Sequence, residues 1–333
     1  MPRLRPLVLA ALALVGFVAV LPAGPAAAVP AAQQRTPITL GFVSYTALSW
    51  PYFAAQAIGS FDQQGVAPDD SALGGAPAVT AALLGGSLDI GLSAIDAHVR
   101  SVEHGANAVW FMTEYNTPIY GLLARSNINS YDDLRGQTIV VDAPNGVTFW
   151  LTRRMLAQAG LGPDDYNFIF AGGTPDRLAA LQAGGVAAAI LIQPFDFAAE
   201  RQGFRRLGNS NQVVRNFEML GYTARRDWIQ RNEDTLARFI RGYQAGQRWL
   251  YDPANREQAI QVLVDKTRLS PDDARATYEL YIERERVFPV GMRINPAGIQ
   301  AALDALVELG DLTEPTPPPS RYVDTTYIDR YGT

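Results

Sequence analysis

The sequence predicts an α/β protein built of two lobes, and three observations support this. Strand-like stretches alternate with helical stretches at the spacing of α/β units, which is typical of a largely parallel sheet. A chain of 333 residues is too long for one typical core. One stretch of the first half is also repeated in the second half. Hydrophobic residues make up 48% and charged residues 18%, as in an ordinary globular protein.

The repeated stretch occupies residues 74–93 and again 172–193. Both copies open with Gly-Gly-x-Pro, continue with Ala-Ala-Leu and place a Gly-Gly pair before a short apolar run. The offset between them is 98 residues as far as Leu83 and Leu181, and we expect one extra residue, Ala183, to shift it to 99. Each copy predicts a helix, a turn and a strand. The same structural unit is therefore expected once in each lobe.

Further elements follow the same alternation of apolar runs and amphipathic stretches. Apolar runs bounded by turn residues predict strands at 37–44, 88–93, 108–115, 119–125, 137–141, 166–172 and 186–192. From about Trp228 onward the spacing of apolar residues is helical. Helices are expected there at 232–252, 270–287 and 295–310, followed by a proline-rich terminal segment.

Residues 1–28 predict a cleaved export signal. A basic start precedes an apolar stretch at 7–21, and small residues then place Ala26 and Ala28 as in a signal-peptidase site. The alternative is a membrane-spanning helix, but this stretch falls short of the roughly 20 apolar residues that a bilayer requires. We therefore expect an exported protein, located in the periplasm, in the cell envelope or outside the cell.

Charge and cysteine content exclude several classes of partner and chemistry. The net charge is −5, and it becomes near −7 once Arg3 and Arg5 are removed with the signal. This balance argues against nucleic acid or anionic lipid as a partner. The chain has no cysteine, which excludes disulfides, thiolate catalysis, cysteine-ligated metals and a lipid anchor through cysteine.

Several stretches, in this order and spacing, carry a family resemblance over about residues 36–330. They are GxFxxxGV at 59–66, AALLGGSLDIGLS at 81–93, DLRGQTIVV at 133–141, LAQAGL at 156–161 and LAALQAGGVAAAI at 178–190. The chain resembles the solute-binding proteins of ABC importers in the aliphatic-sulfonate, taurine, nitrate and thiamine-pyrimidine group. The family commonly has Gly-x-Val-Asp-Ala in the second lobe, where this chain has Gly185-Val186-Ala187-Ala188-Ala189. Asp89 thus has no acidic counterpart at Ala188.

The resemblance implies a type II periplasmic-binding-protein fold. Two mixed sheets flanked by helices form two lobes, and the chain crosses twice between them. The crossings would fall near Asn116–Tyr120 and Phe217–Tyr222. Lobe one would then comprise 36–118 and 221–333, and lobe two 119–220.

The resemblance also implies a function without catalysis, metal or cofactor. Such a protein captures a small organic molecule in the cleft, as a monomer, and delivers it to an ABC permease and its ATPase. Two alternatives stay open: a pyrimidine-synthesis enzyme of a related branch, which relies on a cysteine-rich motif and a reactive histidine, and an extracellular sensor domain. This chain has no cysteine, no histidine in a cleft loop and no nucleophile elbow, phosphate loop or dinucleotide fingerprint. No catalytic residue is therefore assigned.

Ligands of open α/β sheets bind beyond the carboxyl ends of the strands, where helix N-termini present free N–H groups. Four loops and the first crossing, at 114–116, meet this description. The loops are Ser44-Tyr45 with Ser49-Trp50, then 93–96, 142–148 and 193–196. The candidate ligand-binding residues are the polar, aromatic and glycine residues there: Ser44, Tyr45, Trp50, Ser93, Asp96, Glu114, Tyr115, Asn116, Asp142, Asn145, Gly146, Thr148, Gln193 and Phe195.

Some of these side chains have structural alternatives. Trp50 fits a hydrophobic core equally well, and Asp142 fits a helix cap better than a ligand contact. His98 and His104 lack the spacing of metal ligands. Four pairs of adjacent aspartates are expected to cap helices, because neighbouring residues do not face one another: 69–70, 132–133, 164–165 and 272–273.

The charges of the candidate loops favour one kind of ligand. None of the four loops offers Lys or Arg, whereas Asp96, Glu114, Asp142 and Asp196 lie among aromatic residues. Carboxylates accept hydrogen bonds from N–H groups, and aromatic walls stack on flat rings. This favours a neutral or amine-bearing ligand, such as a thiamine-related aminopyrimidine. A sulfonate, taurine or nitrate stays open, because backbone amides can hold an anion without arginine.

Overall fold

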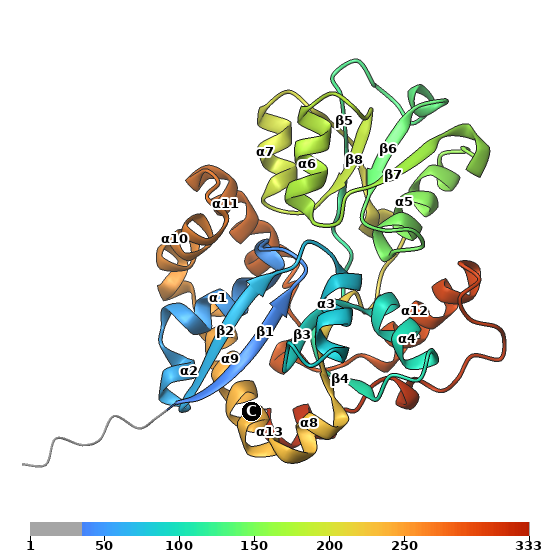
Figure 1. Ribbon diagram of the computed structural model, residues 1–333. Helices are drawn as coiled ribbons and strands as arrows, with labels where there is room; N and C mark the ends of the chain where they lie inside the picture. The colour runs from blue at the N-terminus through green and yellow to red at the C-terminus, as the bar shows by residue number, and fades with distance from the viewer. Residues whose placement is uncertain (1–34, 333) are drawn as a thin grey trace, which may run out of the picture. The chain divides into compact units, whose positions relative to one another are not determined.

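Two five-stranded sheets form the framework of the protein, a computed structural model that describes residues 35–332 (Figure 1). The predicted signal segment, 1–28, lies outside these residues. The first sheet has the order β2-β1-β3-β10-β4. β1 is parallel to β2 and β3, whereas β10 is antiparallel to β3 and β4. Its strands are β1 (Thr36–Phe42), β2 (Val66–Ala72), β3 (Ile90–Ala94), β4 (Ala108–Tyr115) and β10 (Leu220–Arg225).

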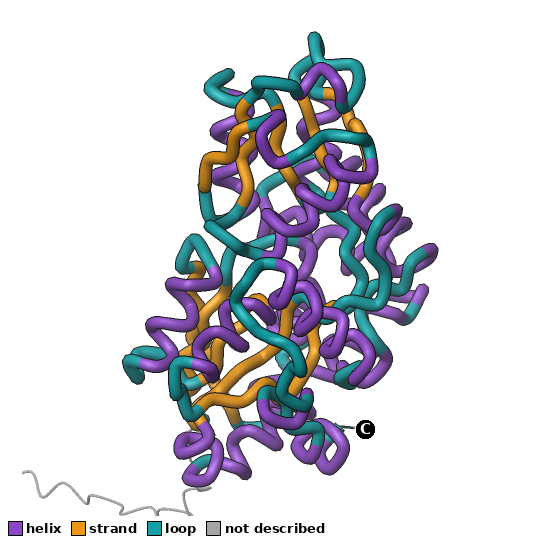
Figure 2. The backbone as a smooth tube through the Cα atoms, turned by 90° about the vertical axis from the view of Figure 1, so that its right-hand side faces the viewer, coloured by secondary structure: helices purple, strands orange, loops and turns teal. Residues whose placement is uncertain are grey.

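The second sheet repeats this pattern with the order β7-β6-β8-β5-β9. β6 is parallel to β7 and β8, and β5 is antiparallel to β8 and β9. Figure 2 shows the two groups of strands from the side. The predicted fold class, α/β with two mixed sheets, is confirmed. The strands of this sheet are β5 (Gly121–Ala124), β6 (Thr138–Val141), β7 (Asn167–Phe170), β8 (Ala188–Leu191) and β9 (Arg205–Asn209).

Helices cover both faces of the first sheet. On one face lie α1 (Trp50–Ala57) and α9 (Glu233–Tyr251), which pack through aromatic rings. The ring centres of Tyr52 in α1 and Phe42 in β1, for example, are 4.9 Å apart. On the other face, α3 (Ala76–Leu84) approaches so closely that a Cβ at Gly91 would lie 2.8 Å from a methyl of Val79. α4 (Ile95–Glu103) continues this face beside β4.

The second sheet is flanked by α6 (Thr174–Gln182) and α7 (Phe195–Arg201) on one side and by α5 (Val147–Gln158) on the other (Figure 1). The C-terminal region is helical, as expected. The predicted helix at 270–287 is divided into α11 (Pro271–Tyr278) and a π-helix at Glu279–Arg284. The remaining α-helices are α2 (Ser60–Gln63), α8 (Arg226–Arg231), α10 (Arg256–Thr267), α12 (Pro296–Glu308) and α13 (Thr326–Tyr331). No helix within 35–332 has the length and apolar character of a membrane span.

The repeated stretch forms equivalent helix–strand units, α3–β3 and α6–β8, but its register differs from the expectation. Both helices have nine residues, and the left-handed turn glycines are Gly86 (φ 81°) and Gly184 (φ 75°). The offset therefore stays at 98 throughout, and the shift at Ala183 was wrong. The left-handed conformation, which favours glycine, decides the alignment rather than the position of the Gly-Gly pairs. The structural counterpart of Asp89 is Ala187, not Ala188.

Two connecting segments join the sheets: the first connecting segment, 116–120, between β4 and β5, and the second, 210–219, between β9 and β10. They lie side by side. Phe217 N–H donates to the Asn116 carbonyl at 3.1 Å, and Met219 N–H donates to the Tyr115 carbonyl at 3.2 Å. The predicted lobe boundaries at 118/119 and 220/221 fall in the first segment and at the start of β10, and they stay predictions.

Two edge strands and one acidic pair differ from the sequence-based expectations. The sequence did not predict β2 and β9. Each is the edge strand of its sheet and pairs with one neighbour, and β2 contains Pro68 and two aspartates. Asp69 and Asp70 therefore lie in a strand rather than at a helix start, so their predicted capping role was wrong. Asp70 instead accepts hydrogen bonds from the hydroxyls of Tyr45 and Tyr52, at 2.7 and 2.9 Å.

Candidate functional site

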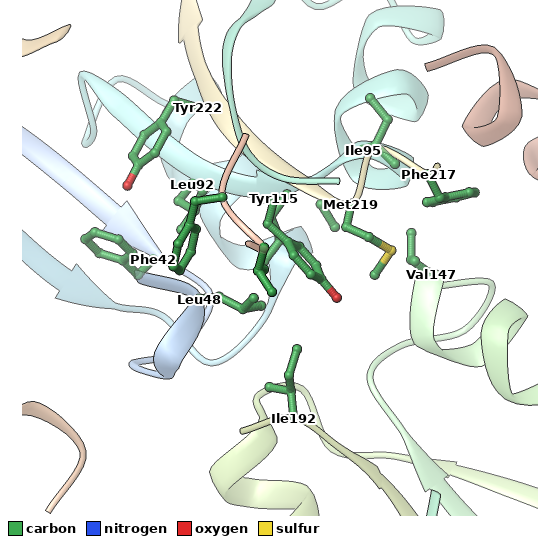
Figure 3. Close-up of a cluster of buried hydrophobic side chains, with 14 of the residues drawn as sticks. Phe42, Leu48, Leu92, Ile95, Tyr115, Val147, Ile192, Phe217, Met219 and Tyr222 are labelled. Carbon is green, nitrogen blue, oxygen red and sulfur yellow. The ribbon is translucent and has the colours of Figure 1, made fainter. Parts of the chain in front are cut away.

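A cavity of about 330 Å³ lies at the carboxyl ends of the three parallel strands of each sheet. Its walls come from the loops after β1, β2 and β3 of the first sheet and after β6, β7 and β8 of the second. This is the position at which open α/β sheets bind ligands. Part of the wall is apolar and belongs to the core cluster of Figure 3, where Leu48, Leu92, Val147, Ile192 and Met219 are labelled.

Two buried polar atoms of this wall have no hydrogen-bond partner within residues 35–332. They are Ser49 Oγ and Asp96 Oδ1, and the two residues are 1% and 5% exposed. An unpaired buried polar group costs free energy, so such atoms are rare in native proteins. Both belong to the first-sheet side, where Ser49 precedes α1 and Asp96 lies in the first turn of α4. A hydrogen-bonding ligand group would satisfy them.

The other carboxylate oxygen of Asp96 is paired with Arg100, whose Nη1 lies 2.7 Å from Oδ2. Arg100 also binds Asp311 at 2.7 Å and donates to the backbone carbonyl of Asn145, in the loop after β6. Burial raises the pKa of Asp96 to about 6, because desolvation outweighs the attraction of the Arg100 guanidinium. Asp96 therefore carries its negative charge at neutral pH.

Arg177, in α6, supplies a positive charge to the second-sheet side of the cavity. Its guanidinium is buried and donates to the Ile190 carbonyl at 2.8 Å, to Thr174 Oγ1 at 2.9 Å and to the Gly172 carbonyl. No carboxylate of residues 35–332 forms an ion pair with it; the acids that influence it most are Asp142 and Asp176. Burial lowers its pKa from the usual value, but arginine remains charged near neutral pH.

Asp142 lines the cavity and also caps α5. Its carboxylate accepts hydrogen bonds from the backbone N–H groups of Phe149 at 3.2 Å and Thr148 at 3.4 Å. In return, the backbone N–H of Asp142 donates to Thr148 Oγ1 at 3.1 Å. Negative charge at a helix N-terminus is stabilised by the free N–H groups there. The capping interpretation is thus confirmed, and a carboxylate used in this way is less available to a ligand.

The helices of the repeated unit, α3 and α6, both begin at the cavity. The N-cap residue of each is a glycine, which has no side chain to bind the N–H groups of the first turn, and the second residue of each helix is a proline, which has no N–H. The preceding glycines, Gly74 and Gly172, are equivalent in the repeat and touch: a Cβ on Gly172 would overlap the Gly74 carbonyl oxygen. Two uncapped helix N-termini thus face one cavity from opposite sheets, which favours a partly negative ligand.

Residues 48–256 match the model of the family described as NMT1/THI5 like. The chain belongs to the NMT1/THI5-like family. This confirms the resemblance that the order of the sequence stretches indicated. A search of curated protein sequences finds no match.

Solved structures with the same fold include binding proteins of ABC importers. The ligand-binding component of an ABC-type import system from Staphylococcus aureus, with zinc bound, is 14% identical with a TM-score of 0.75, over 90% of this chain and 99% of that one. The alkanesulfonate-binding protein SsuA from Xanthomonas axonopodis pv. citri, bound to MOPS, is 17% identical with a TM-score of 0.71, over 87% and 98%. The periplasmic nitrate-binding protein NrtA from Synechocystis is 15% identical with a TM-score of 0.74, over 89% and 86%. At these identities the likeness shows the fold.

Of the residues predicted for this NMT1/THI5-like chain, Ser44, Asp96, Asp142 and Thr148 line the cavity. Tyr45 and Phe195 line an adjoining cavity of about 360 Å³ beside Lys266. Ser93 is buried, with its hydroxyl 3.1 Å from that of Thr80. Their roles in ligand binding stay predictions.

The remaining predicted residues lie outside both cavity walls. Trp50 is fully buried and donates through Nε1 to the Ala259 carbonyl at 3.0 Å, which is a core position. Gln193 is buried behind the wall, where its side-chain carbonyl accepts from the Tyr281 hydroxyl at 3.0 Å. Glu114 is fully buried and accepts from the Tyr243 hydroxyl, and burial raises its pKa well above the usual value. Tyr115 is also buried, Asn116 lies in the first connecting segment, and Asn145 and Gly146 precede α5.

The two histidines also lie away from the cavity. His98 is buried with Nε2 2.8 Å from the Tyr322 carbonyl, and burial lowers its pKa to about 4. His104 Nδ1 lies 2.7 Å from the Arg100 carbonyl at the end of α4. In the part of the chain that the structure describes, no group of three or more His, Asp or Glu side chains is placed to hold a metal.

Sequence reasoning missed Ser49 and Arg177 as site residues. Ser49 was placed in a candidate loop, but nothing in the sequence showed that its hydroxyl lacks a partner. Arg177 stands inside a predicted helix, where a charged residue is usually interpreted as solvated. A usable signal existed: at the offset of 98, its counterpart in the first copy is Val79, so the repeat places Arg177 at a core position.

Proposed function

We propose that this protein is an extracytoplasmic solute-binding protein that captures a small organic molecule in the cavity and delivers it to an ABC permease and its ATPase. The family membership and the shared fold support this assignment. The single observation that carries it is the cavity itself. It lies between two sheets that two segments join, and two buried polar atoms on its wall, Ser49 Oγ and Asp96 Oδ1, have no hydrogen-bond partner within residues 35–332. Export follows from the predicted signal at 1–28.

The ligand that fits best has an acidic group and an N–H donor. Arg177 and the uncapped N-termini of α3 and α6 favour the acidic group, and Asp96 Oδ1 accepts from the donor. Arg177 adds the positive charge that the four loops lack. Among the ligand classes considered from the sequence, a taurine-type aminosulfonate meets both requirements. A thiamine-related pyrimidine meets the requirement at Asp96.

A thermal-shift screen of the mature protein tests the proposal, with taurine, alkanesulfonates, MOPS, nitrate and thiamine-related pyrimidines as probes. A ligand at 100 times its Kd adds about 2.7 kcal/mol to the free energy of unfolding. We expect taurine to raise the Tm most in wild type and Asp96→Asn to reduce that shift. Asp132→Asn, at an exposed position, is the matched control and should leave it unchanged. If none of the probes shifts the Tm, the ligand assignment is wrong.

A second measurement separates binding from the enzyme and sensor alternatives. Mass spectrometry should recover the bound probe with its mass unchanged after prolonged incubation, whereas turnover would overturn the binding assignment in favour of an enzyme. Uptake of the labelled probe should require both this protein and an ABC permease. If cells that lack this protein still take up the probe but no longer change transcription in response to it, the sensor alternative would be favoured.

A further inference from the structure

A buried glutamate, Glu218, joins the second connecting segment to β4 and α12. Its side chain is 0% exposed. Oε2 accepts a hydrogen bond from the Thr113 hydroxyl at 2.7 Å, and Oε1 accepts from the Asn295 backbone N–H at 2.7 Å. Asn295 is the N-cap of α12, and the Glu218 backbone N–H donates to the Gly298 carbonyl in the same helix at 3.2 Å. One residue of the second connecting segment thus binds two further elements, β4 and α12, at the point where the sheets are joined.

The contact between α12 and this segment is close. A Cβ added at Gly298 would lie 3.0 Å from Glu218 Cγ and 3.1 Å from its backbone nitrogen. Within the segment, Asn216 has the left-handed conformation, at φ 53°, and the ring of the next residue, Phe217, stacks on that of Trp150 in α5 with 5.1 Å between the ring centres. The segment is therefore held from both sheets.

The residue after Glu218 belongs to the cavity. Met219 lines the cavity wall and, through its carbonyl, accepts a hydrogen bond at 3.1 Å from Ile95 N–H, at the start of α4. Ile95 precedes Asp96, whose Oδ1 lacks a partner. A change in how Glu218 is held would therefore reach both the cavity wall and the first turn of α4.

We propose that Glu218 is a protonation-dependent positioning residue: its neutral form holds β4, the second connecting segment and α12 together, and its ionisation loosens this junction. The inference does not depend on which ligand the cavity binds. It goes beyond the binding function by naming the group that controls how tightly the two sheets are joined.

The surroundings of Glu218 explain the direction of the effect. Burial raises its pKa to about 7, and the hydrogen bonds from Thr113 and Asn295 oppose this only in part. Both contacts survive protonation, because a proton on Oε2 can be donated to the Thr113 hydroxyl oxygen while Oε1 still accepts from Asn295 N–H. Those two partners are uncharged, and no Lys, Arg or His of residues 35–332 forms an ion pair with Glu218. Its acidic neighbour on β4, Glu114, is adjacent to Thr113 in the strand, so its side chain points to the opposite face, where it binds Tyr243.

The sign follows from linkage. When the junction opens to water, the pKa of Glu218 falls toward 4.5, its ordinary value, so the open form releases the proton more readily. Opening is therefore least favoured below pH 4.5 and becomes easier as the pH rises toward 7. Above 7 both forms are ionised, and the effect levels off.

Amide hydrogen exchange of the ligand-free mature protein tests this between pH 5 and 8, with rates expressed as protection factors for peptides covering 112–120 and 214–222. In wild type we expect protection of these peptides to fall tenfold or more between pH 5 and 7. Glu218→Gln mimics the neutral form and should remove the pH dependence, with protection at pH 7.5 above that of wild type. Asp196→Asn is the matched control, because it removes another fully buried carboxyl whose pKa burial also raises, and it should keep the fall.

Thr113→Val provides a second test that leaves the carboxyl in place. It deletes the hydroxyl whose hydrogen bond lowers the pKa of Glu218, so the fall in protection should move to higher pH. Peptides from β7 report any global unfolding. Constant wild-type protection from pH 5 to 8, or the same fall in Glu218→Gln, would overturn the proposal.

Discussion

The two sheets share one strand order but bring different side chains to the cavity. The first sheet contributes Asp96 and Ser49, both with an unpaired polar atom, whereas the second contributes the Arg177 guanidinium together with Asp142, whose carboxylate caps α5. At the repeat offset of 98, the residue that is Arg177 in α6 is Val79 in α3, packed against Gly91. The duplicated unit therefore conserves a scaffold, and single substitutions within it create the chemistry of the site.

Replacing Arg177 by valine, the residue at the equivalent position of the first unit, should have the largest effect on the free energy of unfolding. Arg177→Val removes the donors that bind the carbonyls of Gly172 and Ile190 and the hydroxyl of Thr174, so each of these groups loses a buried hydrogen bond to a charged donor. We expect the free energy of unfolding to fall by about 2–4 kcal/mol, measured by urea denaturation. Arg215→Val, at an exposed arginine that binds one backbone carbonyl, is the control and should cost less than about 0.5 kcal/mol. Equal losses in the two variants would mean that Arg177 holds no buried network.

The contact between the two equivalent turns should give the next largest effect. Gly172→Ala places a methyl group against the Gly74 carbonyl, whereas Gly75→Ala meets nothing closer than 3.7 Å. Overpacking of this kind costs about 1–3 kcal/mol, so Gly172→Ala should lower the urea midpoint clearly and Gly75→Ala should leave it almost unchanged. If both alanines are tolerated, the turns of α3 and α6 do not touch in solution.

The smallest effect concerns a hydrogen-bonded pair that only the first sheet has. Asp89 Oδ2 accepts from Thr39 N–H and from the Thr39 hydroxyl, both at 2.9 Å. In the second sheet the equivalent residues are Ala187 and Thr138, joined by a backbone hydrogen bond at 2.8 Å. Asp89→Ala should lower the free energy of unfolding by about 1 kcal/mol. No measurable loss in Asp89→Ala would mean that the side-chain contact with Thr39 adds nothing to the backbone hydrogen bond that both sheets have at this position.

Local patterns in the sequence predicted the fold class and the repeated unit. Strands such as 137–141 are short apolar runs, and helices such as α3 have apolar residues at helical spacing. β2 and β9 escaped this reasoning, since an edge strand with Pro68 and two aspartates is defined by its neighbour rather than by its own pattern. The Gly-Gly pairs misled the alignment, because only the backbone conformation shows that Gly86 and Gly184 correspond.

The candidate site was predicted in position and only partly in residues. The rule that ligands lie beyond strand ends located the cavity and four of its lining residues, among them Asp96 and Asp142. It could not tell which loop side chains turn inward, so Trp50 and Glu114 were included although they are buried in the core. Nor could it recognise an arginine held by carbonyls that lie 5 and 13 residues away in the sequence.

The interleaving of the strands along the chain also sets an order of assembly. The second sheet is built entirely from residues 121–209, whereas the first sheet needs β10, at 220–225, to place β4 beside β3. A chain that emerges from its N-terminus can therefore finish the later sheet before the earlier one. Until residue 225 is available, β4 keeps an unpaired edge of eight buried residues, which is the kind of surface that aggregates or recruits a chaperone.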